Sequence, residues 1–176
     1  TKQEAEREFE DPYSTIETIK AVIEKAPYSF YNGLYNLFNL ETQKDIEEFW
    51  SNIAFYNFVQ EIMKDVHQKP SPTNRMKAWR CLAEVSKVLQ PTFILFLGIR
   101  NWYGTHALEG TDTKCILEWD KTIKISKVTP AYGRLILPQR EIPFSIIRHT
   151  AMGFNAPAWG EYLQNKVPEV MSALRL

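Results

Sequence analysis

Apolar residues recur at steps of three or four along much of the chain, which is the period of an amphipathic helix. This period predicts helices at residues 15–25, 30–38, 72–89, 156–165 and 168–174. The third helix has clear ends, because Ser71 can cap it, Pro72 suits its first turn and Pro91 follows its last turn. The second is dense in aromatic residues, so we expect it to pack into the core or to line a pocket.

Three shorter runs are apolar on both faces, at residues 53–59, 92–97 and 143–147. Such runs are typical of strands that helices cover on both sides. The first two flank the helix at 72–89, and a strand–helix–strand unit makes its two strands parallel. Short β-like runs at 115–117, 122–125 and 134–137 can form edge strands or another parallel strand. We therefore expect an α/β fold, namely a three-layer α/β/α sandwich around a central, mainly parallel sheet of about four strands.

The composition fits one globular unit. The chain has 176 residues, of which 44% are hydrophobic and 13% aromatic, enough for a compact core. No repeat, low-complexity tract or linker divides it, so we expect a single domain over residues 1–176. The apolar runs are far shorter than the roughly 20 residues of a membrane helix, and no signal-peptide pattern opens the chain. We expect a cytoplasmic, monomeric protein without a membrane partner.

Charge and metal-binding residues narrow the chemistry. Twenty-one basic and 21 acidic residues cancel, so any contact with nucleic acid must come from a local basic patch. Cys81 and Cys115 are too few for a disulfide framework, and we expect free thiols. The three histidines lack the short spacings of a zinc site. We therefore expect neither a metal nor a cofactor.

Candidate binding residues follow the predicted strands, because ligands of open parallel sheets bind beyond the carboxyl ends of the strands. This rule selects Asn57 and the residues 98–100 and 148–154. The Asn57 carboxamide offers one acceptor and two donors, which match the edge of an imide such as uracil. Two plainer interpretations stay open here. Asn57 can bond the backbone of a neighbouring loop, and His149 can be a strand-end histidine satisfied by the main chain.

Three segments carry a family pattern. Residues 49–59, 75–98 and 143–154 read FWSNIAFYNFV, RMKAWRCLAEVSKVLQPTFILFLG and PFSIIRHTAMGF. They resemble, in the same order, three segments of the uracil-DNA glycosylase superfamily. These are the strand ending in the Asn that reads the base, the helix and strand that follow it, and the last strand with its His-Pro-Ser loop. The iron–sulfur branches of this superfamily use four cysteines, so two cysteines indicate a branch without a cluster.

The resemblance implies hydrolysis of the N-glycosidic bond of a flipped-out uracil or related damaged base, as in DNA base-excision repair. His149 would be the catalytic residue, donating a hydrogen bond as a neutral imidazole to the O2 of the leaving base. Asn57 would hold the base edge, and Phe30 would stack on the base. The expected partner is DNA.

The resemblance also assigns DNA contacts to residues near the strand ends. Arg100, Arg148, Met152 and Phe154 would touch DNA, with the last two in the place of the family's apolar wedge. Helix packing is the alternative role of Met152 and Phe154.

The chain departs from the family in two places. The first strand, which supplies the group that orients the attacking water, is missing or atypical, since residues 1–11 are polar. The His-Pro-Ser loop reads His149, Thr150, Ala151. A catalytically silent module that binds nucleic acid or a nucleotide is therefore the main alternative. A third possibility is a hydrolase or transferase acting on a small nucleoside-like ligand.

Overall fold

The computed structural model describes residues 17, 20, 21, 23, 29–61, 68–151 and 153–174. Its helices are α3 (Ser29–Phe38), α4 (Gln43–Asn52), α5 (Pro72–Leu89), α6 (Ala156–Lys166) and α7 (Pro168–Leu174), with short 3₁₀ turns η1 (Ile99–Trp102) and η2 (Thr105–Leu108). Its strands are β1 (Ile94–Leu97), β2 (Lys114–Trp119), β3 (Ala131–Leu137) and β4 (Arg140–Ile147). The helix predicted at residues 15–25 falls largely outside the described residues.

The four strands form one sheet in the order β1-β4-β3-β2. β1 and β4 are parallel, whereas β2 with β3 and β3 with β4 are antiparallel. The sheet is thus mixed, and the prediction of a mainly parallel sheet is wrong. Only Pro138 and Gln139 separate β3 from β4, and so short a loop can join antiparallel strands but not parallel ones. The run predicted at 122–125 contributes only an isolated bridge between Ile125 and Val128.

The segment at residues 53–59 is not a strand, contrary to the sequence prediction, and runs without regular secondary structure beside β1. The predicted parallel pair around α5 is therefore absent, and the parallel neighbour of β1 is β4. Phe58 of the irregular segment packs its ring 5.3 Å from that of Phe96 and 5.5 Å from that of Trp79. The apolar pattern thus reflects burial of the segment rather than a place in the hydrogen-bonded sheet.

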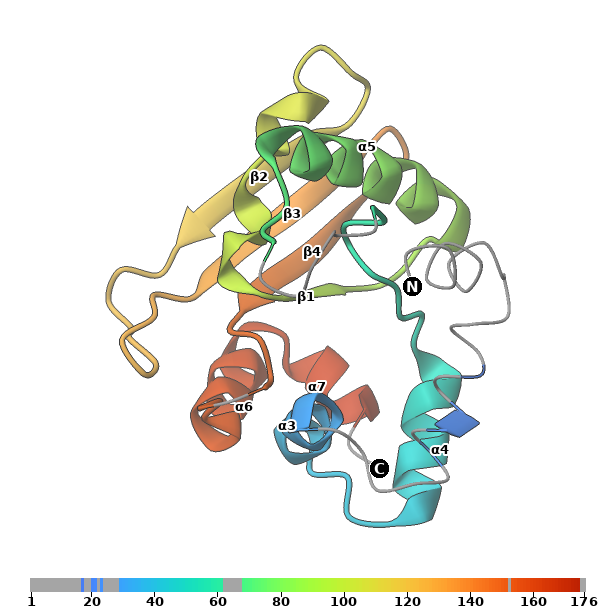
Figure 1. Cartoon of the computed structure of the whole chain (residues 1–176), viewed down its shortest axis with the longest axis vertical. Helices are drawn as coiled ribbons and strands as arrows, with labels where there is room; N and C mark the ends of the chain where they lie inside the picture. Colours follow the sequence, from blue (N-terminus) through green and yellow to red (C-terminus); the bar gives the residue numbers. More distant parts are fainter. Residues whose placement is uncertain are drawn as a thin grey trace.

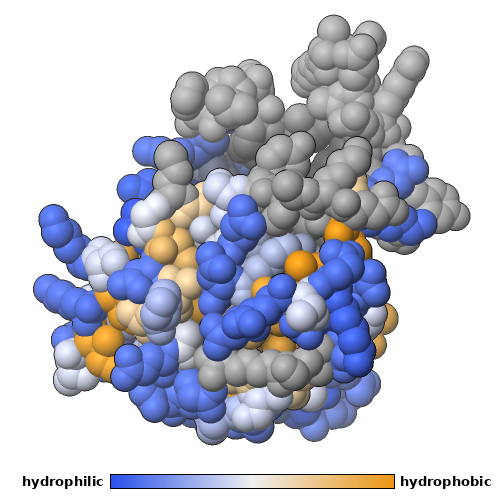
Figure 2. All heavy atoms as spheres, turned by 90° about the horizontal axis from the view of Figure 1, so that it is seen from below, coloured by the Kyte–Doolittle hydropathy of each residue, from blue (hydrophilic) through white to orange (hydrophobic). Residues whose placement is uncertain are grey.

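Helices pack on both faces of the sheet, with α5 on one side and α3, α6 and α7 on the other (Figure 1). On the α5 face, Trp79 and Leu82 pack with Phe96, Phe144 and Ile146. On the opposite face, Ile147 joins the buried residues of the other helices. Seen from that side, the described surface is largely hydrophilic, with smaller apolar areas between polar side chains (Figure 2).

Residues 98–100 and 148–154, which were both selected from the sequence, follow strands whose carboxyl ends lie side by side. Leu97 pairs with Ile147 at the carboxyl ends of the parallel strands β1 and β4, and the Gly98 amide donates a 2.9 Å hydrogen bond to the Ile147 carbonyl. The turn η1 and the loop that carries His149 both begin at these carboxyl ends. Among the described residues, no helix is both long and apolar enough to cross a membrane.

Candidate functional site

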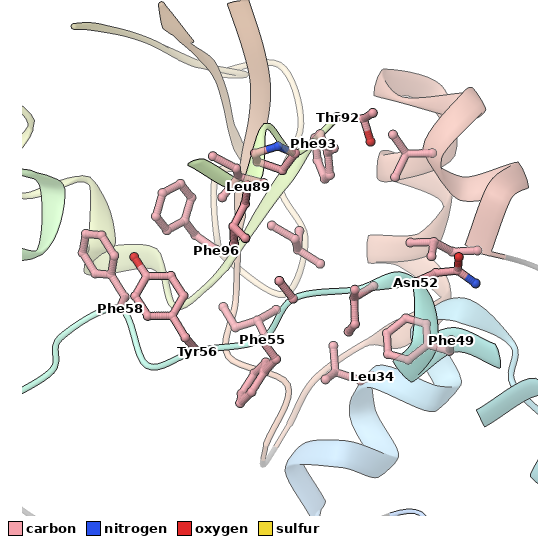
Figure 3. Close-up of a pocket in the computed structure, with 18 of the residues that line it drawn as sticks. Leu34, Phe49, Asn52, Phe55, Tyr56, Phe58, Leu89, Thr92, Phe93 and Phe96 are labelled. Atoms are coloured by element: carbon pink, nitrogen blue, oxygen red, sulfur yellow. The ribbon is translucent and has the colours of Figure 1, made fainter. Parts of the chain in front are cut away.

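A cavity of about 570 Å³ lies between α3, α4, the irregular segment and β1. Its walls are mainly aromatic and aliphatic; Figure 3 shows among them Leu34, Phe49, Phe55, Tyr56, Phe58, Phe93 and Phe96. Three residues selected from the sequence, Phe30, Asn57 and His149, line this same cavity. They come from α3, the irregular segment and the loop after β4, so only the tertiary structure brings them together.

The loop after β4 fixes the tautomer of His149. The Nδ1 of His149 accepts a 3.2 Å hydrogen bond from the Ala151 amide, so in the neutral ring the proton is on Nε2. His149 as a whole is exposed, but the partial burial of its imidazole lowers the pKa of this side chain below its ordinary value. At neutral pH the ring is therefore mainly neutral, and among the described residues its Nε2–H has no hydrogen-bond partner.

Phe30 connects the His149 loop to α3. Its half-buried ring lies with its centroid 5.0 Å from that of the His149 imidazole, at 47° between planes, and 6.0 Å from that of Phe55. The buried Thr150 donates a 2.8 Å hydrogen bond from its hydroxyl to the Phe30 carbonyl. The aromatic ring and the histidine are thus positioned by the same helix–loop contact.

Asn57 is exposed and lies on the wall formed by the irregular segment. Among the described residues, its carboxamide makes no hydrogen bond, so the interpretation of a side chain satisfied by a neighbouring loop has no support within them. The acceptor and the two donors of Asn57 are available to a ligand.

Sequence reasoning missed several polar groups on the cavity wall. Asn101 of η1 lines it, and its carbonyl accepts a 2.9 Å hydrogen bond from the indole of Trp79. Two hydroxyls, those of Tyr56 and Ser86, are buried and have no hydrogen-bond partner among the described residues. Burial raises the pKa of Tyr56, so this phenol stays protonated. Tyr56 lies in an apolar run and Ser86 in an amphipathic helix, and no pattern in the sequence singles either of them out.

The cavity wall holds no carboxylate among the described residues. Two groups on the wall can take part in hydrolysis without a carboxylate. The Asn101 carboxamide can orient a water molecule, and the His149 imidazole can donate a hydrogen bond to a leaving group. Asn52 also lines the cavity, but its Nδ2 donates a 2.8 Å hydrogen bond to the Glu48 carbonyl within α4. The described wall therefore combines an apolar surface with the polar groups of Asn57, Asn101 and His149.

Of the residues expected to touch DNA, Arg100, Arg148 and Phe154 lie outside the cavity wall. Arg148 is half-buried, with its guanidinium close to Gly153, and Arg100 is exposed on η1. Phe154 stacks on Trp159, with ring planes 2° apart and centroids 6.4 Å apart, and packs against the core. Met152 falls outside the described residues. Phe154 thus takes the helix-packing role that the sequence left open for it.

Metal ligands do not gather in the described part of the chain, where no group of three or more His, Cys, Asp or Glu residues could hold an ion. Cys81 and Cys115 are free thiols. Burial raises the pKa of Cys115 to about 12, so it is protonated at neutral pH.

Comparison of the chain with protein-family models, with curated proteins and with solved structures finds no match. The functional assignment below therefore rests on the residues and contacts described above.

Proposed function

We propose that this protein binds a uracil or related base that has rotated out of DNA and hydrolyses its N-glycosidic bond, as uracil-DNA glycosylases do. One observation carries the proposal: Phe30, Asn57 and His149, selected from the sequence, line one cavity. The proposed architecture is the three-layer α/β/α sandwich of that superfamily, with α5 on one face of the sheet and α3 and α6 on the other.

His149 is the proposed leaving-group donor. As the N-glycosidic bond breaks, negative charge develops on O2 of the departing base, and a hydrogen bond to this oxygen is stronger in the transition state than in the ground state. The Ala151 amide occupies Nδ1, so the Nε2 proton is the one that can be donated. A neutral imidazole is sufficient, because its hydrogen bond to O2 becomes stronger as the negative charge on O2 grows.

Asn57 and Phe30 are the proposed recognition residues. An Asn carboxamide can donate to one carbonyl of uracil and accept from the imide N–H, a pattern that the edge of cytosine does not offer. Phe30 presents an aromatic ring beside His149, and stacking on such a ring is worth about 1–3 kcal/mol per base. Arg100 and Arg148, near the same sheet edge, are the proposed phosphate contacts.

Binding without hydrolysis is a second candidate function, and the absence of a carboxylate from the described cavity wall favours it. In that case Asn57 and His149 would hold the base, and no carboxylate of the described cavity wall would activate the attacking water.

Uracil release from a single-stranded, uracil-containing oligonucleotide tests the proposed reaction. We expect His149→Ala to slow release by about 100-fold or more. The matched control is His106→Ala, because His106 is exposed on η2 and does not line the cavity. Equal release by the wild type and His149→Ala would overturn catalysis by this residue.

Binding distinguishes the two candidate functions. The probe is the same oligonucleotide carrying 2′-deoxypseudouridine, whose carbon–carbon glycosidic bond cannot be hydrolysed. We expect Asn57→Ala to weaken binding roughly tenfold or more, and the exposed α3 variant Asn36→Ala to leave it unchanged. Tight binding of this probe without any uracil release would select the second function, whereas equal binding by Asn57→Ala and the wild type would refute both.

A further inference from the structure

Among the described strands, β1 lies at the end of the sheet and pairs with β4 alone. Its other hydrogen-bonding edge is therefore free of any described strand. The Gly98 amide points to β4, where it donates to the Ile147 carbonyl. Because peptide groups alternate in direction along a strand, those of Leu95 and Leu97 point away from β4. Their N–H and C=O groups form an edge that no other described strand pairs with.

This open edge borders the cavity. Leu95 and Leu97 line it, and the irregular segment that carries Tyr56 and Phe58 forms the opposite wall (Figure 3). Peptide groups without a hydrogen-bond partner beside apolar walls are costly, because each one loses the hydrogen bonds that it would make to water. The cavity thus combines an apolar surface with main-chain donors and acceptors that no other described strand uses.

Two further polar groups point to an occupant. Ser86 of α5 is 1% exposed, and its hydroxyl has no partner among the described residues, as is true of the buried Tyr56 hydroxyl. Both residues line the same cavity. An occupant made only of hydrocarbon would leave these hydroxyls and the β1 edge unpaired, whereas a peptide carries donors and acceptors between its side chains.

We propose that the open edge of β1 binds an extended segment of a second polypeptide, which adds one strand to the sheet. The bound strand has apolar side chains on both faces, because the cavity walls on both sides of β1 are apolar. β1 has four residues, so the paired stretch is about 13 Å long at roughly 3.3 Å per residue. The inference rests on the β1 wall and the two buried hydroxyls and not on base recognition by Asn57 and His149, which would use the same cavity.

Selection from a phage-displayed library of random heptapeptides tests the proposal, with the whole chain as bait. We expect enriched peptides that are apolar at consecutive positions. N-methylation of the peptide residues that face β1 should weaken binding about tenfold or more, whereas N-methylation of the alternate residues should leave it nearly unchanged. This comparison uses the wild-type protein throughout.

A pair of variants locates the site. Leu95→Pro removes an amide that faces the open edge and is not used by β4, and proline is tolerated at such edge positions. Leu95→Ala trims the side chain but keeps the amide. We expect Leu95→Pro to lose about tenfold more affinity for a selected peptide than Leu95→Ala. Amide hydrogen exchange of Leu95 and Leu97 in the wild type should slow when the peptide is added.

Any one of three results would overturn the proposal. These are the absence of enriched peptides from the selection, equal binding of the peptides with either pattern of N-methylation, and unchanged amide hydrogen exchange of Leu95 and Leu97 when the peptide binds. A dimer in solution that dissociates in Leu95→Pro would instead assign the edge to a second copy of this chain.

Discussion

The hydroxyl of Thr150 donates a 2.8 Å hydrogen bond to the carbonyl of Phe30, a residue 120 positions earlier in the chain. This partly buried hydrogen bond and the bond from the Ala151 amide to the Nδ1 of His149 hold the loop after β4. The imidazole therefore has a defined place beside the ring of Phe30.

Removing this hydrogen bond should destabilise the protein. Thr150→Val keeps the shape of the side chain but removes the donor, so we expect the free energy of unfolding to fall by about 1 kcal/mol in urea denaturation. Thr73→Val, at an exposed position of α5, makes the same chemical change and should stay within about 0.5 kcal/mol of the wild type. Equal stability of Thr150→Val and the wild type would contradict a role for this bond.

Gly33 is expected to tolerate no side chain. A Cβ at this position would lie 2.1 Å from the Thr150 carbonyl oxygen, so Gly33→Ala must push the His149 loop away from α3. Alanine favours a helix by about 1 kcal/mol over glycine, but we expect the clash to outweigh this gain and lower stability by about 1–3 kcal/mol.

Thermal unfolding and base binding measure the effect of Gly33→Ala. Asn36→Ala, at an exposed position of the same helix, supplies the helix-propensity gain without the clash. A Gly33→Ala protein as stable as Asn36→Ala, with unchanged affinity for the pseudouridine probe, would show that the close approach is not needed.

The lowered pKa of His149 predicts a pH dependence. Between this pKa and the ordinary value of 6.5, the unfolded chain binds more protons than the folded one. The stability that the neutral ring contributes is therefore fully present above pH 6.5 and is lost as the pH falls through the folded pKa. We expect the His149 ring protons to titrate below pH 6.5 by NMR, and uracil release to decline over the same acidic range.

A substitution of His149 tests the assignment of that pH dependence. In His149→Gln, the loss of stability between pH 6.5 and the folded pKa should become smaller, because the titrating group is gone. An NMR midpoint at or above 6.5 would show that burial does not disfavour the charged ring.

Phe154 and Arg100 should separate packing from DNA contact. Phe154 stacks on Trp159, so we expect Phe154→Ala to lower stability by about 2 kcal/mol and to leave affinity for the pseudouridine oligonucleotide unchanged. Arg100 is exposed, so Arg100→Ala should keep stability within about 0.5 kcal/mol. It should also reduce the slope of log affinity against log salt by about 1. A Phe154→Ala protein of unchanged stability but weaker affinity for the oligonucleotide would make Phe154 a DNA contact.

Local signals predicted much of the helical structure. The predicted ranges 72–89 and 168–174 coincide with α5 and α7, because apolar period, caps and prolines act within a few residues. Thr42 and Asp45 form a capping box at the start of α4, a signal that is present in the sequence and was overlooked. Likewise, the two residues between β3 and β4 already exclude a parallel pair.

The sequence by itself determined where α5 and α7 begin and end, and that Asn57 and His149 are polar residues beside apolar runs. Only the tertiary structure decided that residues 53–59 pack beside β1 without joining the sheet, and that Phe30 and Thr150 meet. The physical reason is range. Caps and periodicity depend on neighbours along the chain, whereas strand partners and cavity walls depend on how all the helices pack onto both faces of the sheet.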